Sequence, residues 1–428
     1  MNKKLPLISL FIMSIISILY WVFKPKEELY EAKWNAPDTT LAITIDGEIS
    51  TTFPTSSAYT VTVECTTGTG KVDWNGTKWI LTTSGITKGS TKCNAIFNKL
   101  TFADTILANN EVKTPITTPG AAISTASEAL LASTPDDYGT SYYFRGAVKN
   151  NYVEFAKKCW RIVRVGGDGS VKLILHNDNT TSAANPCNAA NNSVNAAFAR
   201  YSGTTYTSKF NEKRDDNAYV GFKYGTPGSS TYEATHANTN KSTILTNLET
   251  WYNNNLKTYE SVIDDTAWCN DKTIVTDTSY NPNSASGGNA TGLGYGTNKT
   301  YYGASQRLVS NSGSAGGTGP SLKCNGDLSK IASKVGLVTV DELAFAGYAD
   351  GPQNSTTYLQ ENATDTMWWS LSPFFFNGGN ASVWGVYSGF LMSAFVYQPY
   401  GVRPSISLKP STNVTGNGTS EIPYKIST

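Results

Sequence analysis

The chain has 428 residues and a formal net charge of +1, and only 16% of its residues are charged. A chain of this length can form two or three domains that each bury a core. Its sparse, balanced charge excludes the concentrated Lys/Arg face of a nucleic-acid-binding protein, so we expect no nucleic-acid partner. Aromatic residues make up 12% of the chain, which excludes disorder and indicates a β-rich extracellular protein.

The first predicted element is a membrane helix at residues 5–23, an uncharged apolar run behind Lys3 and Lys4. About 20 apolar residues in a helix span the hydrocarbon core of a bilayer. The run ends in bulky residues and lacks the small-residue cleavage site of a signal peptide. We therefore expect a single-pass signal anchor in the cell membrane, with residues 1–4 as a cytoplasmic tail. Residues 24–40 would be a stalk, and the bulk of the chain would be extracellular.

Alternating apolar residues predict a small β-sandwich at residues 41–113. Apolar side chains alternate with Thr at residues 41–45 and 59–63, and clusters of turn-forming residues separate these runs. The dipeptide Asn75-Gly76, shortly before Trp79, predicts a β-hairpin.

Two regions of different composition follow the sandwich. Residues 114–137 contain Pro115, Pro119 and an Ala/Ser stretch, which is typical of a linker, and residues 121–131 within it are expected to form a short helix. Residues 138–428 contain no comparable linker, and we therefore predict one large domain there.

Three patterns predict the secondary structure of this large domain. Apolar residues on one helical face predict a helix at residues 242–256. A Thr-x-x-Glu capping box predicts a second helix that begins after Thr339. Alternating apolar residues predict a hairpin around the turn at 166–169 and a β-meander between residues 367 and 408.

The chain has six cysteines and two histidines, which limits its metal chemistry. No two cysteines form a CxxC pair, so we expect no zinc site and no other cofactor; calcium is left open, although no residues point to it. An even cysteine count outside the cell favours disulfides over free buried thiols, which are the alternative. We expect neighbours to pair, with the first pair joining two sheets of the sandwich: Cys65–Cys93, Cys159–Cys187 and Cys269–Cys324.

Four motifs in the large domain resemble those of a known family. They are CWRIVRV at 159–165, LVTVDE at 337–342, WWSLSP at 368–373 and GVRPSISLK at 401–409. They are similar to uncharacterised domains of Gram-positive bacterial surface proteins that share the formylglycine-generating-enzyme variant of the C-type-lectin fold. The resemblance covers residues 142–409. It implies a C-type-lectin-like fold for the large domain. Together with the membrane helix and the small β-sandwich predicted from the residues, the expected fold class is a β-rich α+β protein.

The chemistry of this family does not carry over with the fold. Formylglycine-generating enzymes use a cysteine pair near the end of the domain, and here no cysteine follows Cys324. Calcium-dependent lectins use a Glu-Pro-Asn or Gln-Pro-Asp loop, whereas this chain has Gln398-Pro399-Tyr400. We therefore expect no catalytic residues and no enzymatic activity.

Arg403 lies between Val402 and Pro404 on the last predicted strand. Burying an unpaired guanidinium is costly, so a carboxylate partner is expected. Asp341 or Glu342, at the capped start of the second helix, is the predicted partner in a structural ion pair, and contact of Arg403 with a ligand is the alternative.

The meander carries more aromatic residues than alternating strands can bury, and aromatic rings stack on sugars. The protein is therefore predicted to be a membrane-anchored bacterial surface protein that binds a glycan or a protein partner. The alternatives are an exported enzyme of unknown reaction on the same scaffold, and a structural or display protein. The predicted ligand-binding residues are Phe375, Asn377, Asn380, Trp384, Tyr387 and Tyr400.

Overall fold

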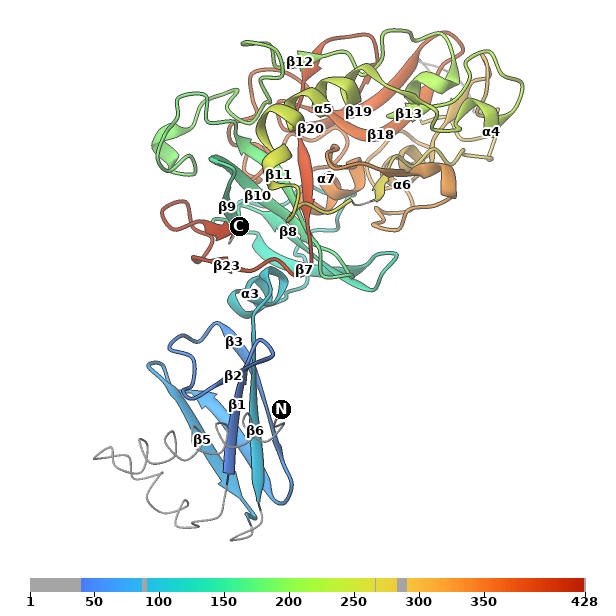
Figure 1. Cartoon of the computed structure of the whole chain (residues 1–428). Helices are drawn as coiled ribbons and strands as arrows, with labels where there is room; N and C mark the ends of the chain where they lie inside the picture. The colour runs from blue at the N-terminus through green and yellow to red at the C-terminus, as the bar shows by residue number, and fades with distance from the viewer. Residues whose placement is uncertain (1–39, 87–90, 266, 283–290, 427–428) are drawn as a thin grey trace, which may run out of the picture. The chain divides into compact units, whose positions relative to one another are not determined.

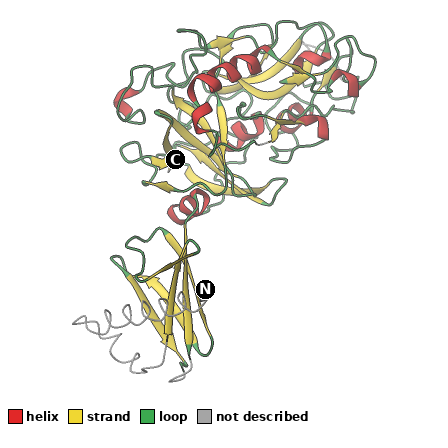
Figure 2. Cartoon of the chain, in the orientation of Figure 1, coloured by secondary structure: helices red, strands yellow, loops and turns green. Residues whose placement is uncertain are grey.

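The computed structural model describes residues 40–86, 91–265, 267–282 and 291–426 (Figure 1). These residues form two compact units that divide between Thr101 and Phe102, and each unit is described by itself. The described residues of the first unit are strands and loops, and the second unit combines sheets with short helices (Figure 2). The predicted β-rich α+β class is confirmed.

The predicted cytoplasmic tail at residues 1–4, the membrane segment at 5–23 and nearly all of the stalk at 24–40 lie outside the described residues. Within the described part of the chain, no helix has the length and the apolar character needed to cross a membrane. The anchor stays a prediction from the sequence.

The first unit contains two sheets that share one core. Its strands are β1 (Thr40–Ile45), β2 (Glu48–Ser50), β3 (Tyr59–Cys65), β4 (Thr69–Trp74), β5 (Trp79–Ser84) and β6 (Lys92–Lys99). The order in the larger sheet is β2-β1-β6-β3, with β1 parallel to β6, while β4 and β5 form the predicted hairpin. Apolar side chains of both sheets, among them Ile43, Leu81 and Phe97, form the core. The strands end at Lys99, well before residue 113.

The first disulfide has the predicted partners but a different place in the sandwich. Cys65 and Cys93 face each other on the adjacent strands β3 and β6, with their Cα atoms 4.1 Å apart. The prediction that this bond joins the two sheets was wrong, because β3 pairs with β6 along its whole length. The apolar core, and not a covalent bond, holds the two sheets together.

The predicted linker at residues 114–137 was wrong, because this segment belongs to the second unit. Its last residues form strand β7 (Ala129–Pro135), which pairs along its length with β8 (Thr140–Gly146). Glu128 and Arg145 are both fully buried and form an ion pair at 3.0 Å. No helix forms at 121–131. The pairing of β7 and the buried ion pair override a composition that is typical of linkers.

The second unit begins with helix α3 (Phe102–Asn109) and contains an eight-stranded sheet. Most of its strands follow the order β22-β11-β10-β9-β24-β23, and β7 joins the sheet through β8, which pairs with β10. The remaining strands are β9 (Tyr152–Phe155), β10 (Lys158–Val165), β11 (Val171–Asn177), β22 (Ser405–Leu408), β23 (Val414–Thr415) and β24 (Tyr424–Ile426).

A second, six-stranded sheet contains the predicted meander. Its order is β12-β21-β18-β19-β20, and β16 pairs with the far end of β18. The strands are β12 (Thr207–Ser208), β16 (Thr300–Tyr301), β18 (Trp368–Phe376), β19 (Ala381–Tyr387), β20 (Phe390–Phe395) and β21 (Tyr400–Gly401).

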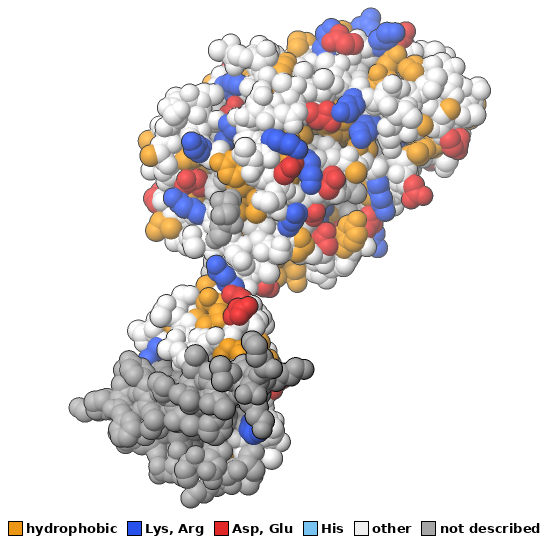
Figure 3. Space-filling view, in the orientation of Figure 1, with side chains coloured by type: hydrophobic (Ala, Val, Ile, Leu, Met, Phe, Trp, Pro, Cys, Tyr) orange, Lys and Arg blue, Asp and Glu red, His pale blue; other side chains and the backbone are white. Residues whose placement is uncertain are grey.

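Short helices and small two-stranded sheets complete the second unit. The α-helices are α4 (Tyr232–Thr235), α5 (Thr243–Asn255), α6 (Gly303–Leu308) and α7 (Val340–Ala346). The 3₁₀-helices are η1 (Ala189–Asn191), η2 (Asn217–Val220), η3 (Lys257–Tyr259) and η4 (Asp327–Ser329). Strand β13 (Lys223–Tyr224) pairs with β14 (Asn240–Lys241), and β15 (Ala267–Cys269) pairs with β17 (Lys330–Ala332). On the face shown in Figure 3, acidic and basic side chains are interspersed over a largely uncharged surface.

The predicted helices and the first hairpin of this unit are confirmed. Ser242 caps α5 by accepting a hydrogen bond from the backbone N–H of Leu245, and the apolar face of α5 is buried. Thr339 and Glu342 form a complete capping box at the start of α7. The loop at 166–169 joins β10 to β11. Local sequence patterns were sufficient for these elements.

A buried group of charges ties α7 to the hairpin β10–β11. The Glu342 carboxylate contacts Arg164 Nε at 2.9 Å and Lys172 Nζ at 2.7 Å. The neighbouring Asp341 accepts hydrogen bonds from Arg307 of α6 at 2.7 and 2.8 Å. These pairs join three elements that are far apart in sequence.

The predicted ion pair of Arg403 with Asp341 or Glu342 was wrong. Arg403 is fully buried, and its Nε and Nη1 donate to the carbonyl oxygens of Leu175 and Leu359 at 2.8 and 2.6 Å. Both carboxylates already have other cations from β10, β11 and α6, so neither reaches Arg403. The guanidinium is accommodated by backbone carbonyls instead of a carboxylate.

The Glu342 cluster predicts a large and pH-dependent stability effect. Although burial acts to raise it, Lys172 and Arg164 hold the pKa of Glu342 at about 2, below the ordinary value of 4.5. The stabilisation should therefore be complete above pH 4.5 and should be lost as the pH falls toward 2. Glu342→Gln should lower the free energy of unfolding by about 3 to 5 kcal/mol at pH 7, because it leaves two buried cations without an anion.

Urea denaturation of both proteins at pH 7 and pH 3 measures this effect, with substitution of the exposed Glu233 by Gln as the control. The difference between wild type and Glu342→Gln should shrink at pH 3. A loss below about 1 kcal/mol at pH 7, the value of an exposed pair, would contradict the assignment.

Candidate functional site

A cavity of about 460 Å³ lies in the second unit, beside the meander β18–β20. One part of its wall is aromatic, and the other part is polar and carries a single carboxylate. The aromatic lining residues are Tyr301, Phe374, Phe375, Trp384 and Phe395. The polar lining residues include Asp350, Asn377, Ser382, Ser393 and Gln398.

Strand pairing builds the aromatic wall. Tyr301 of β16 lies directly opposite Phe375 of β18, and the two rings stack with their centroids 3.9 Å apart. The pairing of β18 with β19 shifts register next to Phe375. Such a bulge re-aims side chains, so Phe374 and Phe375, although consecutive, both reach the cavity. Phe374 packs edge-on against Trp384 at 4.7 Å.

Two polar groups in the aromatic wall have no hydrogen-bond partner within the described structure. They are the indole Nε1 of Trp384 and the hydroxyl of Tyr301. The two residues are only 1% and 0% exposed. Buried polar groups in folded proteins are almost always paired. Both residues line the cavity, so its wall contains an indole N–H and a phenol that have no hydrogen-bond partner in the described structure.

Asp350 supplies the carboxylate of the cavity. Its backbone forms an isolated bridge with Leu391 of β20, which fixes the residue beside the meander. Among the described residues, no hydrogen bond or ion pair is made by its side chain, and no Lys, Arg or His lines the cavity. Burial raises the pKa of Asp350 to about 6. A partly buried carboxylate without a cation destabilises the fold, and such groups concentrate at functional sites.

The structure brings together three of the six predicted ligand-binding residues. Phe375, Asn377 and Trp384 line the cavity. Phe375 and Trp384 are buried and form the cavity wall, so the prediction of an exposed aromatic face was wrong for them. The alternating strands of β18 and β19 turn these two rings away from solvent.

The other three predicted residues lie outside the cavity lining. Tyr387 is 49% exposed at the end of β19, and Tyr400 packs edge-on against Trp369 at 5.2 Å. Asn380 closes the turn between β18 and β19, where its N–H donates to Asn377 Oδ1. No local pattern in the sequence indicates Tyr301 or Asp350, because both reach the site through long-range backbone pairing.

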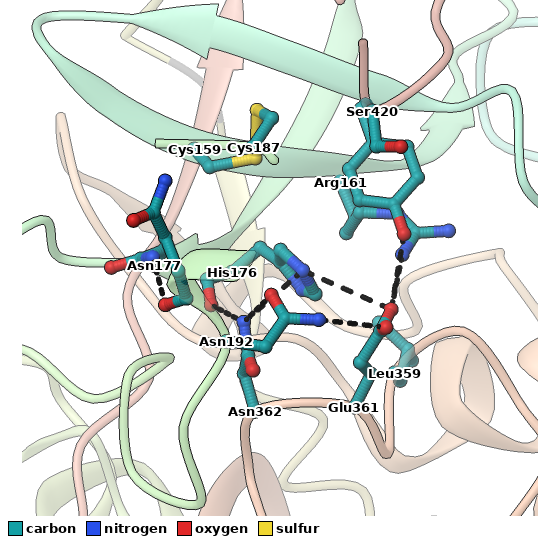
Figure 4. A network of polar contacts seen from close by, with 12 residues as sticks. Cys159, Arg161, His176, Asn177, Cys187, Asn192, Leu359, Glu361, Asn362 and Ser420 are labelled. Carbon is teal, nitrogen blue, oxygen red and sulfur yellow. Dashed lines mark hydrogen bonds and ion pairs between the residues drawn. A yellow bond between two sulfur atoms is a disulfide. The ribbon is translucent and has the colours of Figure 1, made fainter. Parts of the chain in front are cut away.

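A second polar group, around Glu361, contains His176 (Figure 4). Glu361 accepts hydrogen bonds from Tyr152 at 3.0 Å and from Arg161 at 3.3 Å. Asn192 donates to its other carboxylate oxygen at 2.9 Å. Burial and the nearby Arg161 hold the pKa of His176 well below its ordinary value, so its ring is neutral. Because both carboxylate oxygens already accept hydrogen bonds from protein donors, we assign this network a structural role.

Metal-binding side chains and disulfides indicate the chemistry and the location of a protein. Within the described residues, no three His, Cys, Asp or Glu side chains are placed to hold a metal ion. All three predicted disulfides form, which indicates an extracellular or secreted protein.

The unpaired charge of Asp350 predicts an unusual pH dependence of stability. Because its pKa is raised from 3.8 to about 6, the folded state binds more protons than the unfolded state in this window, and stability falls as the pH rises through it. Asp350→Asn should therefore raise the melting temperature at pH 7.5 and change it little at pH 4.

Thermal unfolding followed by circular dichroism at both pH values measures this, with substitution of the exposed Asp215 by Asn as the control. A destabilised Asp350→Asn at pH 7.5 would mean that the carboxylate has a stabilising partner.

Comparisons of the chain with protein-family models, curated proteins and solved structures found no match.

Proposed function

We propose that the second unit is an extracellular carbohydrate-binding domain and that its ligand occupies the aromatic cavity. The observation that carries the proposal is the pair of unpaired polar groups, Trp384 Nε1 and the Tyr301 hydroxyl, in an aromatic wall. A sugar ring has apolar C–H faces, which stack on aromatic rings, and hydroxyl groups, which bond to such donors. The cavity volume of about 460 Å³ is within the range of small-molecule sites.

The wider setting is also part of this proposal. The uncharged run at residues 5–23 supports an anchor in a bacterial cell membrane, and the disulfides support an exterior location. The motifs at 159–165, 368–373 and 401–409 support the relationship to formylglycine-generating-enzyme-like and C-type-lectin-like domains. In this setting the second unit would attach its cell to a glycan of a neighbouring surface.

An exported enzyme is the second candidate, because Asp350 has a pKa near the value that suits a general acid. Enzymes that hydrolyse glycosidic bonds mostly use two carboxylates that flank the bond. The described residues that line this cavity include only one carboxylate, that of Asp350. The site therefore fits binding better than hydrolysis.

Two conservative substitutions should weaken binding while keeping a six-membered aromatic ring at each position. Trp384→Phe removes the indole N–H, and Tyr301→Phe removes the hydroxyl. Each should weaken the affinity for a sugar by about three- to tenfold, since one hydrogen bond contributes about 0.5 to 1.5 kcal/mol. A glycan array probed with the full-length protein identifies ligands, and isothermal titration measures the affinities.

The chain offers matched controls for both substitutions. Trp368 Nε1 and the Tyr252 hydroxyl are also buried without a hydrogen-bond partner in the described structure, but neither residue lines the cavity. Trp368→Phe and Tyr252→Phe should leave the affinity unchanged. An array without a bound glycan, or equal losses in the controls, would refute the proposed site.

A further inference from the structure

The charges around the cavity restrict its ligand further. Asp350 is the only charged residue among the described lining residues. Two phenols lie near it: Tyr280 interacts electrostatically with Asp350, and Tyr301 lines the same cavity. Burial raises the pKa of both phenols, that of Tyr301 to about 12. Both are therefore neutral at physiological pH. The cavity has a net negative charge and would repel an anionic ligand such as a uronic acid or a phosphate.

Asp350 differs from the buried carboxylates elsewhere in the second unit. Glu128 pairs with Arg145, and Glu342 pairs with Lys172. Asp216, which has no cation in the described structure, accepts backbone hydrogen bonds from Ala218 and Gly228 instead. The Asp350 side chain has neither kind of partner among the described residues, although burial disfavours its charge. A bound cation would supply the missing partner.

The aromatic wall favours a cation as well. The faces of Trp and Phe rings are electron-rich and attract ammonium groups, and the attraction grows when the site excludes water. Trp384 and Phe374 line the same cavity as the Asp350 carboxylate. A ligand with an ammonium group beside an apolar ring face would use both parts of the cavity.

We infer that the ligand of this cavity is a glycan containing an amino sugar with a free, protonated amine, which binds beside Asp350 while the sugar ring lies on the aromatic wall. This inference rests on the proposed carbohydrate function and names the sugar class. An N-acetylated sugar would leave the carboxylate without a counter-charge, because an amide is neutral. Sites whose buried polar group is left unpaired discriminate strongly against the neutral analogue.

The test uses two probes of equal length, an oligomer of glucosamine and an oligomer of N-acetylglucosamine. Isothermal titration of the full-length protein at pH 6.5 should show that the glucosamine oligomer binds at least about tenfold more tightly, equivalent to about 1.4 kcal/mol. Asp350→Asn should bring the two affinities close together, while Asp215→Asn should preserve the difference. Because Asp350→Asn is expected to raise stability at neutral pH, unfolding should not obscure the result.

A second measurement determines how the affinity for the glucosamine oligomer depends on pH. The amine stays protonated as the pH falls from 6.5 to 4.5, whereas Asp350 gains a proton in this range, so the affinity for the glucosamine oligomer should fall. Asp350→Asn should show no such fall. A flat profile in the wild type would overturn the inference, because it would show that the carboxylate does not contact the amine.

The remaining outcomes separate this inference from the proposed function. Equal binding of both oligomers, unaffected by Asp350→Asn, would overturn the amino-sugar inference and leave carbohydrate binding intact. If the protein binds no glycan on the array, carbohydrate binding itself is refuted. Binding of choline that depends on Asp350, without binding of any glycan, would overturn the amino sugar in favour of a cation without a sugar.

Discussion

The buried Glu342 carboxylate is the interaction on which the rest of the second unit depends. It joins the start of α7 to Arg164 on β10 and Lys172 on β11, and Asp341 beside it holds Arg307 of α6. Breaking such a network leaves uncompensated charges in a region from which water is excluded. The cluster therefore fixes α7 against the large sheet, and with it the chain that leaves α7 toward the cavity.

That chain carries Asp350 to the meander in only a few residues. Helix α7 ends at Gly347, whose φ of +120° lets the backbone turn where a side chain would clash with Ser124. Tyr348 then donates a hydrogen bond to Gln360, and Asp350 bridges to Leu391 of β20. The same segment thus begins with carboxylates that are fully paired and ends with one that is not. The contrast separates the charges that stabilise the fold from the one that we assign to a ligand.

A disulfide closes the part of the chain that carries Tyr301. Tyr301 lies within the segment that the Cys269–Cys324 disulfide closes, which spans 55 residues. Closing a loop of this length reduces the conformational entropy of the unfolded chain. In the chain-entropy model this raises the free energy of the unfolded chain by roughly 4 kcal/mol. Within this part of the chain, strand β16 pairs with β18 and places Tyr301 on Phe375. An irregular, Gly- and Ser-rich segment in this way contributes a fixed aromatic side chain.

Features that depend on neighbouring residues can be predicted from the sequence alone. Helical spacing located α5, the capping box located the start of α7, and turn residues located the hairpins. The short separations between cysteines were also sufficient to predict the three disulfides. Each of these features follows from chain geometry over a few turns, or from the low entropic cost of closing a short loop.

Contacts between groups that are distant in sequence become apparent only in the folded chain. Arg403 was expected to need a carboxylate, but the carbonyls of Leu175 and Leu359 surround it. Cys65 and Cys93 were expected to link two sheets, but the register of β3 and β6 places them in one. Tyr301 and Asp350 entered the cavity through strand pairing and a single backbone bridge. Such pairings are selected by the burial of the whole core, and no local pattern of residues encodes them.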